Sequence, residues 1–381
     1  MYLTENFLLR IFLKTIDLLL NTKNRKTSKN IIKINKILIS NIGHLGDVVI
    51  STAVIKLIKS NYPDVKIGFL TSTWSLPIIK ESSQVDFSHT FDHFMLNRGK
   101  SIFERLKFHS KSASKSKKEI LLINYDAAID LRHFFPNSIF LLYKSKIPII
   151  TGFNSGGFGP LLNFSHNWEN KNQHLSKYHL ELVHDIFSQI NDTNNLKTNL
   201  NLHFDINEEN ILLRQNKLKR NNYVIFHPGT GNPVRKWPNN YWVQLANLLL
   251  EQGEYIVFTG KSYNENQDII SITKNITTSK YINLCDQLSY IDYCTIVKNS
   301  KYLVSVESFA GHLSGALNKA AVIIGSGTTN KHQWRPLGDS VKYITKDIWC
   351  SPCYMGSGCE TMDCINLITP SIVYNEIIKF V

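Results

Sequence analysis

Two glycine-bearing turns hold the residues of this chain whose types and spacing suggest chemistry. The first turn contains Gly43, His44, Gly46 and Asp47 and follows the apolar run Ile37–Ile42. A carboxylate at the end of a β-strand can act as a general base toward an attacking hydroxyl. The glycines would let an acceptor approach the backbone, and His44 could add a hydrogen bond. Asp47 could instead cap the helix that follows, and the sequence leaves both roles open.

The second turn lies far along the chain and combines backbone amides with cations. Gly229-Thr230-Gly231 follows the apolar run Tyr223–His227 and precedes Arg235 and Lys236. Amides, a hydroxyl and two cations in this arrangement can hold a diphosphate and stabilise charge on a leaving phosphate. The alternative is a glycine turn with solvated cations.

A third segment, Ser305–Leu313, also runs from a strand end to a helix start. Ser308 and the amides that follow it could bind a phosphate at the helix N-terminus. Glu307 could accept hydroxyls of a ribose or cap the helix. For the second turn and this segment together, the residues predicted to bind a donor are Gly229, Thr230, Gly231, Arg235, Lys236, Glu307, Ser308, Ala310, Gly311 and His312.

Four of the six cysteines lie near the C-terminus at metal-ligand spacing: Cys350, Cys353, Cys359 and Cys364. This spacing is compatible with a structural zinc or iron. The alternative is a set of buried, reduced thiols that holds the C-terminal segment in place. No export signal is recognisable, so we expect a cytoplasmic protein rather than a disulfide framework.

Composition indicates a globular protein with a basic surface. The chain has 381 residues, 43% of them hydrophobic, and a net charge of +13, which suits two domains. Between Arg98 and Lys118, eight lysines and arginines stand against one acid, Glu104. Such a segment can face an anionic membrane or an acidic glycolipid, or form a solvated helix. No nucleic-acid-binding module accompanies it, so we do not expect a nucleic-acid partner.

The first twenty residues are apolar but interrupted by charges, among them Arg10, Lys14 and Asp17. They match neither a secretory signal nor a membrane-spanning helix, because the cleavage site and the uninterrupted apolar length are missing. An amphipathic helix fits better. It could lie on the inner face of the cell membrane as a peripheral contact, or pack on the first domain.

Strand-like and helix-like patterns alternate along the rest of the chain, which predicts parallel βαβ units of the α/β class. One strand is expected at Phe91–Leu96. The predicted organisation is an amphipathic leader (1–30), an acceptor-binding Rossmann-like domain (31–190), a linker region (191–220), a nucleotide-sugar-binding Rossmann-like domain with the cysteines (221–365) and a C-terminal helix (366–381).

These motifs, in this order, resemble glycosyltransferase family 9, the ADP-heptose:lipopolysaccharide heptosyltransferases. The resemblance rests on Ile-Gly-His-Leu-Gly-Asp at 42–47, His-Pro-Gly-Thr-Gly-Asn at 227–232 with Arg-Lys-Trp-Pro, Glu-Ser and Gly-His-Leu in 307–313, Trp-Arg-Pro-Leu-Gly at 334–338 and the cysteine tail. The sequence departs from the pattern at Glu307-Ser308-Phe309, where the family has Asp-Thr/Ser-Gly, and at Arg235, where it often has Lys.

The resemblance implies a GT-B fold, with two Rossmann-like domains facing each other across a cleft. It implies inverting, metal-independent transfer of a heptose from ADP-heptose to a lipopolysaccharide core or another anionic surface glycan, with Asp47 as the base. No cofactor is required for this reaction. Two alternatives remain open. One is a family member with another nucleotide-sugar donor or a protein acceptor, and the other is a non-catalytic, basic glycolipid-binding protein.

Overall fold

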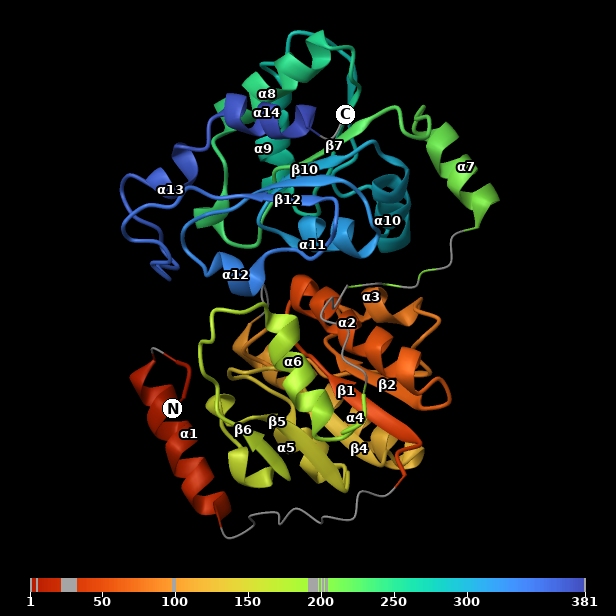
Figure 1. Cartoon of the computed structure of the whole chain (residues 1–381), viewed down its shortest axis with the longest axis vertical. Coiled ribbons are helices and arrows are strands. Elements are labelled where there is room, and N and C mark those ends of the chain that lie inside the picture. Colours follow the sequence, from red (N-terminus) through yellow and green to blue (C-terminus); the bar gives the residue numbers. More distant parts are fainter. Residues whose placement is uncertain are drawn as a thin grey trace. The chain divides into compact units, whose positions relative to one another are not determined.

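The chain folds into two compact units, each built on its own parallel sheet (Figure 1). The computed structural model describes residues 2–4, 6–21, 33–97, 101–190, 198, 200, 202 and 205–379. Unit 1 comprises Met1–Leu196 and Leu200–His203, and unit 2 comprises Lys197–Asn199 and Phe204–Val381. Within the described ranges, no helix combines the length and the apolarity needed to cross a bilayer.

Unit 1 contains a six-stranded sheet in the order β3-β2-β1-β4-β5-β6. Its strands are β1 (Lys36–Ser40), β2 (Lys66–Thr71), β3 (Phe87–Thr90), β4 (Ala127–Asp130), β5 (Ile149–Phe153) and β6 (Phe164–His166). The last residue of β1, Ser40, pairs with Leu70 of β2 and Asp130 of β4. Because all pairs are parallel, the loops after β1 and β4 leave the same edge of the sheet.

Helices cover both faces of this sheet, which explains why its strands are almost wholly apolar. They are α1 (Phe7–Leu20), α2 (Leu45–Asn61), α3 (Leu76–Lys80), α4 (Ile102–Ile123), α5 (Ile139–Lys144) and α6 (Leu175–His184), with 3-10 turns η2 (Asn154–Gly156) and η3 (Gly159–Leu161). Helices α2 and α6 pack together, whereas α4 and α5 bury Ile120 and Leu142 in one cluster with Leu38 of β1.

Unit 2 repeats the plan with strand order β12-β11-β10-β7-β8-β9. Its strands are β7 (Val224–His227), β8 (Ile256–Phe258), β9 (Tyr281–Asn283), β10 (Leu303–Val306), β11 (Ala321–Ile324) and β12 (Val341–Ile344). The central strands β7 and β10 are neighbours, so the second turn and the Ser305–Leu313 segment begin side by side.

The helices of unit 2 are α7 (Ile206–Gln215), α8 (Asn239–Glu251), α9 (Tyr263–Thr273), α10 (Tyr290–Asn299), α11 (Phe309–Ala316), α12 (Lys331–Trp334), α13 (Asp363–Asn366) and α14 (Pro370–Ile378), with the 3-10 turn η4 (Pro233–Arg235). The core of this unit gathers Trp242 of α8 and Val373 of α14 around Phe226 of β7. The C-terminal helix is therefore part of this core.

The structure differs from the sequence-based expectation at two places. The third strand is β3, and Phe91–Leu96 is a loop, because Asp92 accepts hydrogen bonds from the Thr73 N–H at 2.8 Å and from its hydroxyl at 2.7 Å. The region 191–220, predicted as a linker, contains α7. Its buried Glu209 pairs with Lys298 of α10 at 2.6 Å.

Candidate active site

The first turn places Asp47 in the opening turn of α2, after β1. Its Oδ2 accepts a hydrogen bond from the His44 N–H at 3.1 Å and lies 3.8 Å from Nη1 of Arg132. Both contacts use Oδ2, and the side chain is 17% exposed. Asp47 therefore does cap the helix, and it also meets a cation that the sequence analysis did not select.

Arg132 is the buried cation of this site and comes from the loop after β4. Its Nε donates to the Pro136 carbonyl at 2.7 Å, and its guanidinium lies 4.5 Å from the Phe134 ring centroid. Burial lowers the pKa of Arg132, while the carboxylates of Asp47 and Asp130 act in the opposite direction. A buried arginine needs such partners, so the ion pair holds the Asp47 carboxylate in one orientation.

Gly43 lies beneath this ion pair. A Cβ at position 43 would stand 2.4 Å from Nη1 of Arg132, 2.5 Å from Oδ2 of Asp47 and 2.8 Å from Oδ1 of Asn41. Asn41 in turn accepts from the Gly43 N–H at 3.0 Å and donates to Ser51 at 2.9 Å. The glycine is therefore required by three converging side chains, which is a stronger reason than access for an acceptor alone.

In unit 2, the structure joins the two segments predicted to bind a donor. The hydroxyl of Thr230 donates to the backbone carbonyl of Glu307 at 3.1 Å. Ser308 is the N-cap of α11, and its Oγ accepts from the Ala310 N–H at 3.3 Å. The turn after β7 and the start of α11 thus form one continuous group of amides and hydroxyls.

The two cations of the second turn have different surroundings. Nε of Arg235 is buried without a hydrogen-bond partner among the described residues, and it lies 3.9 Å from Oε2 of Glu307. The ammonium of Lys236 instead pairs with Asp268 of α9. Both cations thus have an acidic neighbour, but Arg235 Nε makes no hydrogen bond within the described part of the chain and retains donor capacity, whereas Lys236 is hydrogen-bonded to Asp268.

Glu307 is 9% exposed, and its carboxylate is engaged by the loop after β11. Oε2 accepts from Ser326 N–H at 3.0 Å and from its hydroxyl at 2.8 Å, and Oε1 accepts from Thr329 at 3.1 Å. The Tyr343 hydroxyl also donates to Oε1, and burial together with the nearby Glu307 charge raises the pKa of Tyr343 well above its usual range. Glu307 therefore positions the 325–329 loop. The N-cap of α11 is Ser308 and not Glu307.

Phe309 and Gly311 have structural roles at the start of α11. The Phe309 ring packs toward α10, with centroids 6.1 Å from Tyr290 and 6.4 Å from Tyr293. A Cβ at Gly311 would lie 2.9 Å from Ile323 and 3.0 Å from Pro336. The departure from the family pattern at position 309 thus adds an aromatic contact with α10 and retains a backbone amide.

A further acidic group lies beside the second turn and was missed by the sequence analysis. A Cβ at Gly229 would stand 2.4 Å from the carboxyl carbon of Glu265, in the first turn of α9. Glu265 accepts from the Lys261 N–H at 2.7 Å. The sequence contains a pattern that could have predicted Glu265 as a site residue, because Gly260 and Ser262 mark another turn from a strand end to a helix start.

The cysteine prediction of a metal site is not supported by the structure. Among the residues that are described, no group of three or more His, Cys, Asp or Glu side chains is placed to hold a metal ion. The segment instead braces the 325–329 loop: the Cys353 N–H donates to the Gly327 carbonyl at 3.1 Å, and a Cβ at Gly327 would lie 2.7 Å from that of Cys364.

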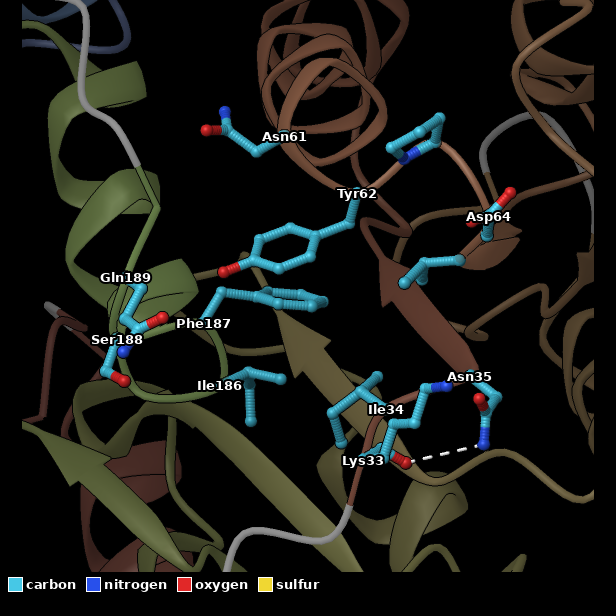
Figure 2. A pocket seen from close by; sticks show the side chains of 12 residues that line it. Lys33, Ile34, Asn35, Asn61, Tyr62, Asp64, Ile186, Phe187, Ser188 and Gln189 are labelled. Carbon is cyan, nitrogen blue, oxygen red and sulfur yellow. Dashed lines mark hydrogen bonds between the residues drawn. The ribbon is translucent and has the colours of Figure 1, made fainter.

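Two cavities of unit 1 lie away from all predicted site residues. One, of about 520 Å³, is bordered by residues that precede β1 and follow α2 and α6 (Figure 2). The rings of Tyr62 and Phe187, 4.7 Å apart, form one wall. The other, of about 570 Å³, lies beside α1 and includes Lys14 and Asp17.

The sequences of known proteins indicate the class of this site. The family model of glycosyltransferase family 9 (heptosyltransferase) matches residues 114–361, more than half of the chain. Lipopolysaccharide heptosyltransferase 3 of Escherichia coli is 22% identical over 305 residues, which are 78% of this chain and 83% of that protein. Lipooligosaccharide heptosyltransferase 2 of Haemophilus influenzae is 23% identical over 311 residues, which are 79% of this chain and 85% of that protein.

Solved structures show the same fold. The E. coli ADP-heptose lipopolysaccharide heptosyltransferase II has a TM-score of 0.73 at 19% identity, covering 91% of this chain and 98% of that one. A family 9 glycosyltransferase from Veillonella parvula has a TM-score of 0.73 at 15% identity, and the match covers 94% of this chain and 99% of that one. The fold is thus the GT-B fold predicted from the sequence, and the chain belongs to glycosyltransferase family 9.

Proposed function

We propose that this glycosyltransferase moves a heptose from ADP-heptose to a sugar of a lipopolysaccharide core or a related surface glycan, with inversion and without a metal ion. The names of its relatives support the donor and acceptor classes. The observation that carries the chemistry is the Asp47 carboxylate, oriented by the buried Arg132 above Gly43.

On the acceptor side, Asp47 acts as the general base. It takes the proton of the acceptor hydroxyl while that oxygen attacks the anomeric carbon of the donor. Arg132 and the His44 N–H hold Oδ2, so we assign proton transfer to Oδ1. His44 and Gly46 form the backbone surface against which the acceptor lies, and the buried Gly43 lets Asp47 and Arg132 approach each other beside it.

On the donor side, the departing diphosphate is stabilised by Arg235, the Thr230 hydroxyl and the amides at Gly229, Gly231 and the start of α11. Ala310, Gly311 and His312 belong to that helix start. We assign the acceptance of ribose hydroxyls to Glu265, because its carboxylate lies beside Gly229. Lys236 and Glu307 act indirectly, through Asp268 and the 325–329 loop.

The test is transfer from a panel of nucleotide sugars to extracted acceptor glycolipid, read by mass spectrometry. A mass increase of one heptose with ADP-heptose alone supports the proposal. Transfer of another sugar, or transfer to protein, would support the first alternative. Calorimetry with ADP addresses the second, because a non-catalytic glycolipid-binding protein would not bind the nucleotide.

A further inference from the structure

Helix α1 is fixed to unit 1 by one of its faces. Leu13 is 1% exposed, and Oδ1 of Asp17 accepts from the Phe158 N–H at 2.6 Å. The Tyr2 hydroxyl donates to the other oxygen of Asp17 at 2.8 Å, and the Leu3 N–H donates to Ser155 at 3.0 Å. The helix is therefore a docked part of the unit.

The opposite face of α1 is apolar and exposed. Its large side chains are Phe7 (69% exposed), Leu8 (75%), Ile11 (47%), Phe12 (50%), Leu18 (72%) and Leu19 (71%). At 100° per residue, these positions fall within one arc of about 140°. The exposed Thr15 lies in the same arc. Six large apolar side chains gathered around it form a patch typical of a binding surface, because exposed hydrophobic residues are more commonly scattered singly.

The charges that border this arc are positive. Arg10 and Lys14 lie on α1 beside Phe7 and Leu18, and both side chains are exposed. The acid of the helix, Asp17, is occupied by its contacts with Tyr2 and Phe158. An apolar stripe flanked by cations is typical of helices that lie in the plane of an anionic membrane surface.

Helix α4 carries a basic and apolar outer surface of its own. Its exposed lysines are Lys107, Lys111, Lys115, Lys117 and Lys118. Phe103 is 82% exposed and Leu122 is 85% exposed. Of its two acids, Glu104 accepts from Ser101 at the helix start, and Glu119 is paired with His89 at 3.1 Å and with Lys115 at 3.7 Å.

Both helices lie over the same face of the unit 1 sheet. Ile120 of α4 and Leu142 of α5 are members of one buried cluster, and Leu20 of α1 packs against it. Helix α5 lies between them and exposes Phe140, which contacts Phe158 with centroids 5.7 Å apart. The outer sides of α1 and α4 therefore belong to the side of unit 1 that this cluster covers, and α1 is the red helix at the edge of unit 1 in Figure 1.

We propose that unit 1 binds the surface of an anionic lipid bilayer through the outer faces of α1 and α4. The apolar arc of α1 inserts among the acyl chains near the headgroups, and the lysines of α4 contact the headgroup phosphates. A second copy of the chain is a poorer occupant, because it would place one lysine-rich face against another. This inference does not depend on the identity of the donor or acceptor sugar.

The experiment is co-sedimentation of the purified full chain with vesicles of phosphatidylcholine, with and without phosphatidylglycerol. We expect binding to the anionic vesicles, with weaker binding at high salt, and little binding to pure phosphatidylcholine. Leu8→Ser with Phe12→Ser should lower the partition coefficient at least about tenfold. The matched control is Ile211→Ser with Tyr263→Ser, two exposed apolar residues of unit 2 that should leave binding unchanged.

The charge contribution is tested separately. Changing Lys107, Lys111 and Lys118 to Gln should weaken anionic vesicle binding about 100-fold, since each lysine contributes on the order of 1 kcal/mol near such a surface. The control changes Lys274, Lys280 and Lys346, exposed lysines of unit 2, in the same way. Circular dichroism confirms that each variant is folded.

Three results would overturn the proposal. The first is equal binding to neutral and anionic vesicles, and the second is equal loss of binding in the variants and their controls. The third is a dimer in sedimentation velocity that the Leu8→Ser, Phe12→Ser variant dissociates, without vesicle binding by the wild type. That result would assign the apolar face of α1 to a second copy.

Discussion

The glycine turns of the two units are built differently, although each follows a central strand of a parallel sheet. Around Gly43, the side chains of Asn41, Asp47 and Arg132 converge so closely that a methyl group has no room. Around Gly231, a Cβ would meet nothing within 4 Å. The acidic turn is thus closely packed at Gly43. The cationic turn is closely packed at Gly229, against Glu265, and open at its second glycine, Gly231.

This difference suits the two proposed roles. A general base must hold one orientation before the acceptor arrives, and a buried ion pair provides that orientation. A diphosphate site must admit a large anion, and in the second turn Gly231 is exposed and the Arg235 side chain is 32% exposed. The structure accordingly leaves Arg235 Nε without a hydrogen-bond partner among the described residues and pairs Lys236 with Asp268.

The largest effect is expected at the packed turn. Asp47→Asn should reduce turnover about 10³-fold, because the amide cannot accept the hydroxyl proton. ADP affinity, measured by calorimetry, should stay within about twofold, since the base acts in the transition state. Asp64→Asn, an exposed acid of the same unit, is the control and should keep full turnover. Near-normal transfer by the Asp47 variant would remove it as the base.

The second-largest effect is expected in acid, which should destabilise unit 1 more than unit 2. Burial lowers the pKa of several unit 1 histidines, listed here: His89, His93, His109, His133 and His179. Among the described histidines of unit 2, burial lowers the pKa of His227. The native unit 1 therefore binds fewer protons than its unfolded chain, and it loses stability as pH falls below the unfolded histidine pKa of about 6.5.

The pKa values of His93 and His179 fall to about 3. Each of these two histidines should therefore lower the free energy of unfolding by about 1.4 kcal/mol at about pH 5.5, relative to neutral pH. His166 opposes this trend, because its hydrogen bond to Asp185 raises its pKa. Hydrogen exchange followed by mass spectrometry should show β4 and β5 losing protection before β7 and β10, and less so in His179→Leu. Equal acid sensitivity of the two units would contradict the prediction.

A methyl group at each turn tests the packing directly. Gly43→Ala should destabilise the protein by about 2 kcal/mol, because Arg132 or Asp47 must move to admit the Cβ. Gly231→Ala should change the free energy of unfolding by less than about 0.5 kcal/mol. Thermal unfolding of both variants is the measurement. Equal destabilisation would show that the two turns are packed alike.

The smallest effect concerns the two cations. Arg235→Gln should weaken ADP binding about tenfold through loss of a charge-assisted hydrogen bond, whereas Lys236→Gln should change it less than about twofold. Calorimetry at fixed ionic strength measures both. A larger loss of ADP affinity in the Lys236 variant than in the Arg235 variant would mean that Lys236 leaves Asp268 to bind the phosphates. Lys236 would then be assigned to the donor site in place of Arg235.

The segments from strand ends to helix starts were predictable because they depend on local periodicity. Apolar runs such as Ile37–Ile42, followed by a helical spacing of apolar residues, are sufficient to place β1 and α2. Phe91–Leu96 was predicted wrongly as a strand for a tertiary reason. Its Asp92 binds Thr73 from the loop after β2, a contact that no short window of sequence contains.

The partners of the site residues could not be predicted in this way. Arg132 reaches Asp47 because β4 lies beside β1 in the sheet, and that strand order is a property of the whole unit. For the same reason, Glu307 meets Ser326 and Tyr343 through the adjacent strands β11 and β12, so its carboxylate holds a loop.

The amino-acid sequence alone determined the α/β class, the two turns and the acidic and cationic residues that each turn carries, since these follow from patterns within one strand–turn–helix segment. Only the tertiary structure decided which of those charges are paired. Parallel strands bring together loops that are distant in sequence, and the energy of a buried charge depends on the partners that those loops supply.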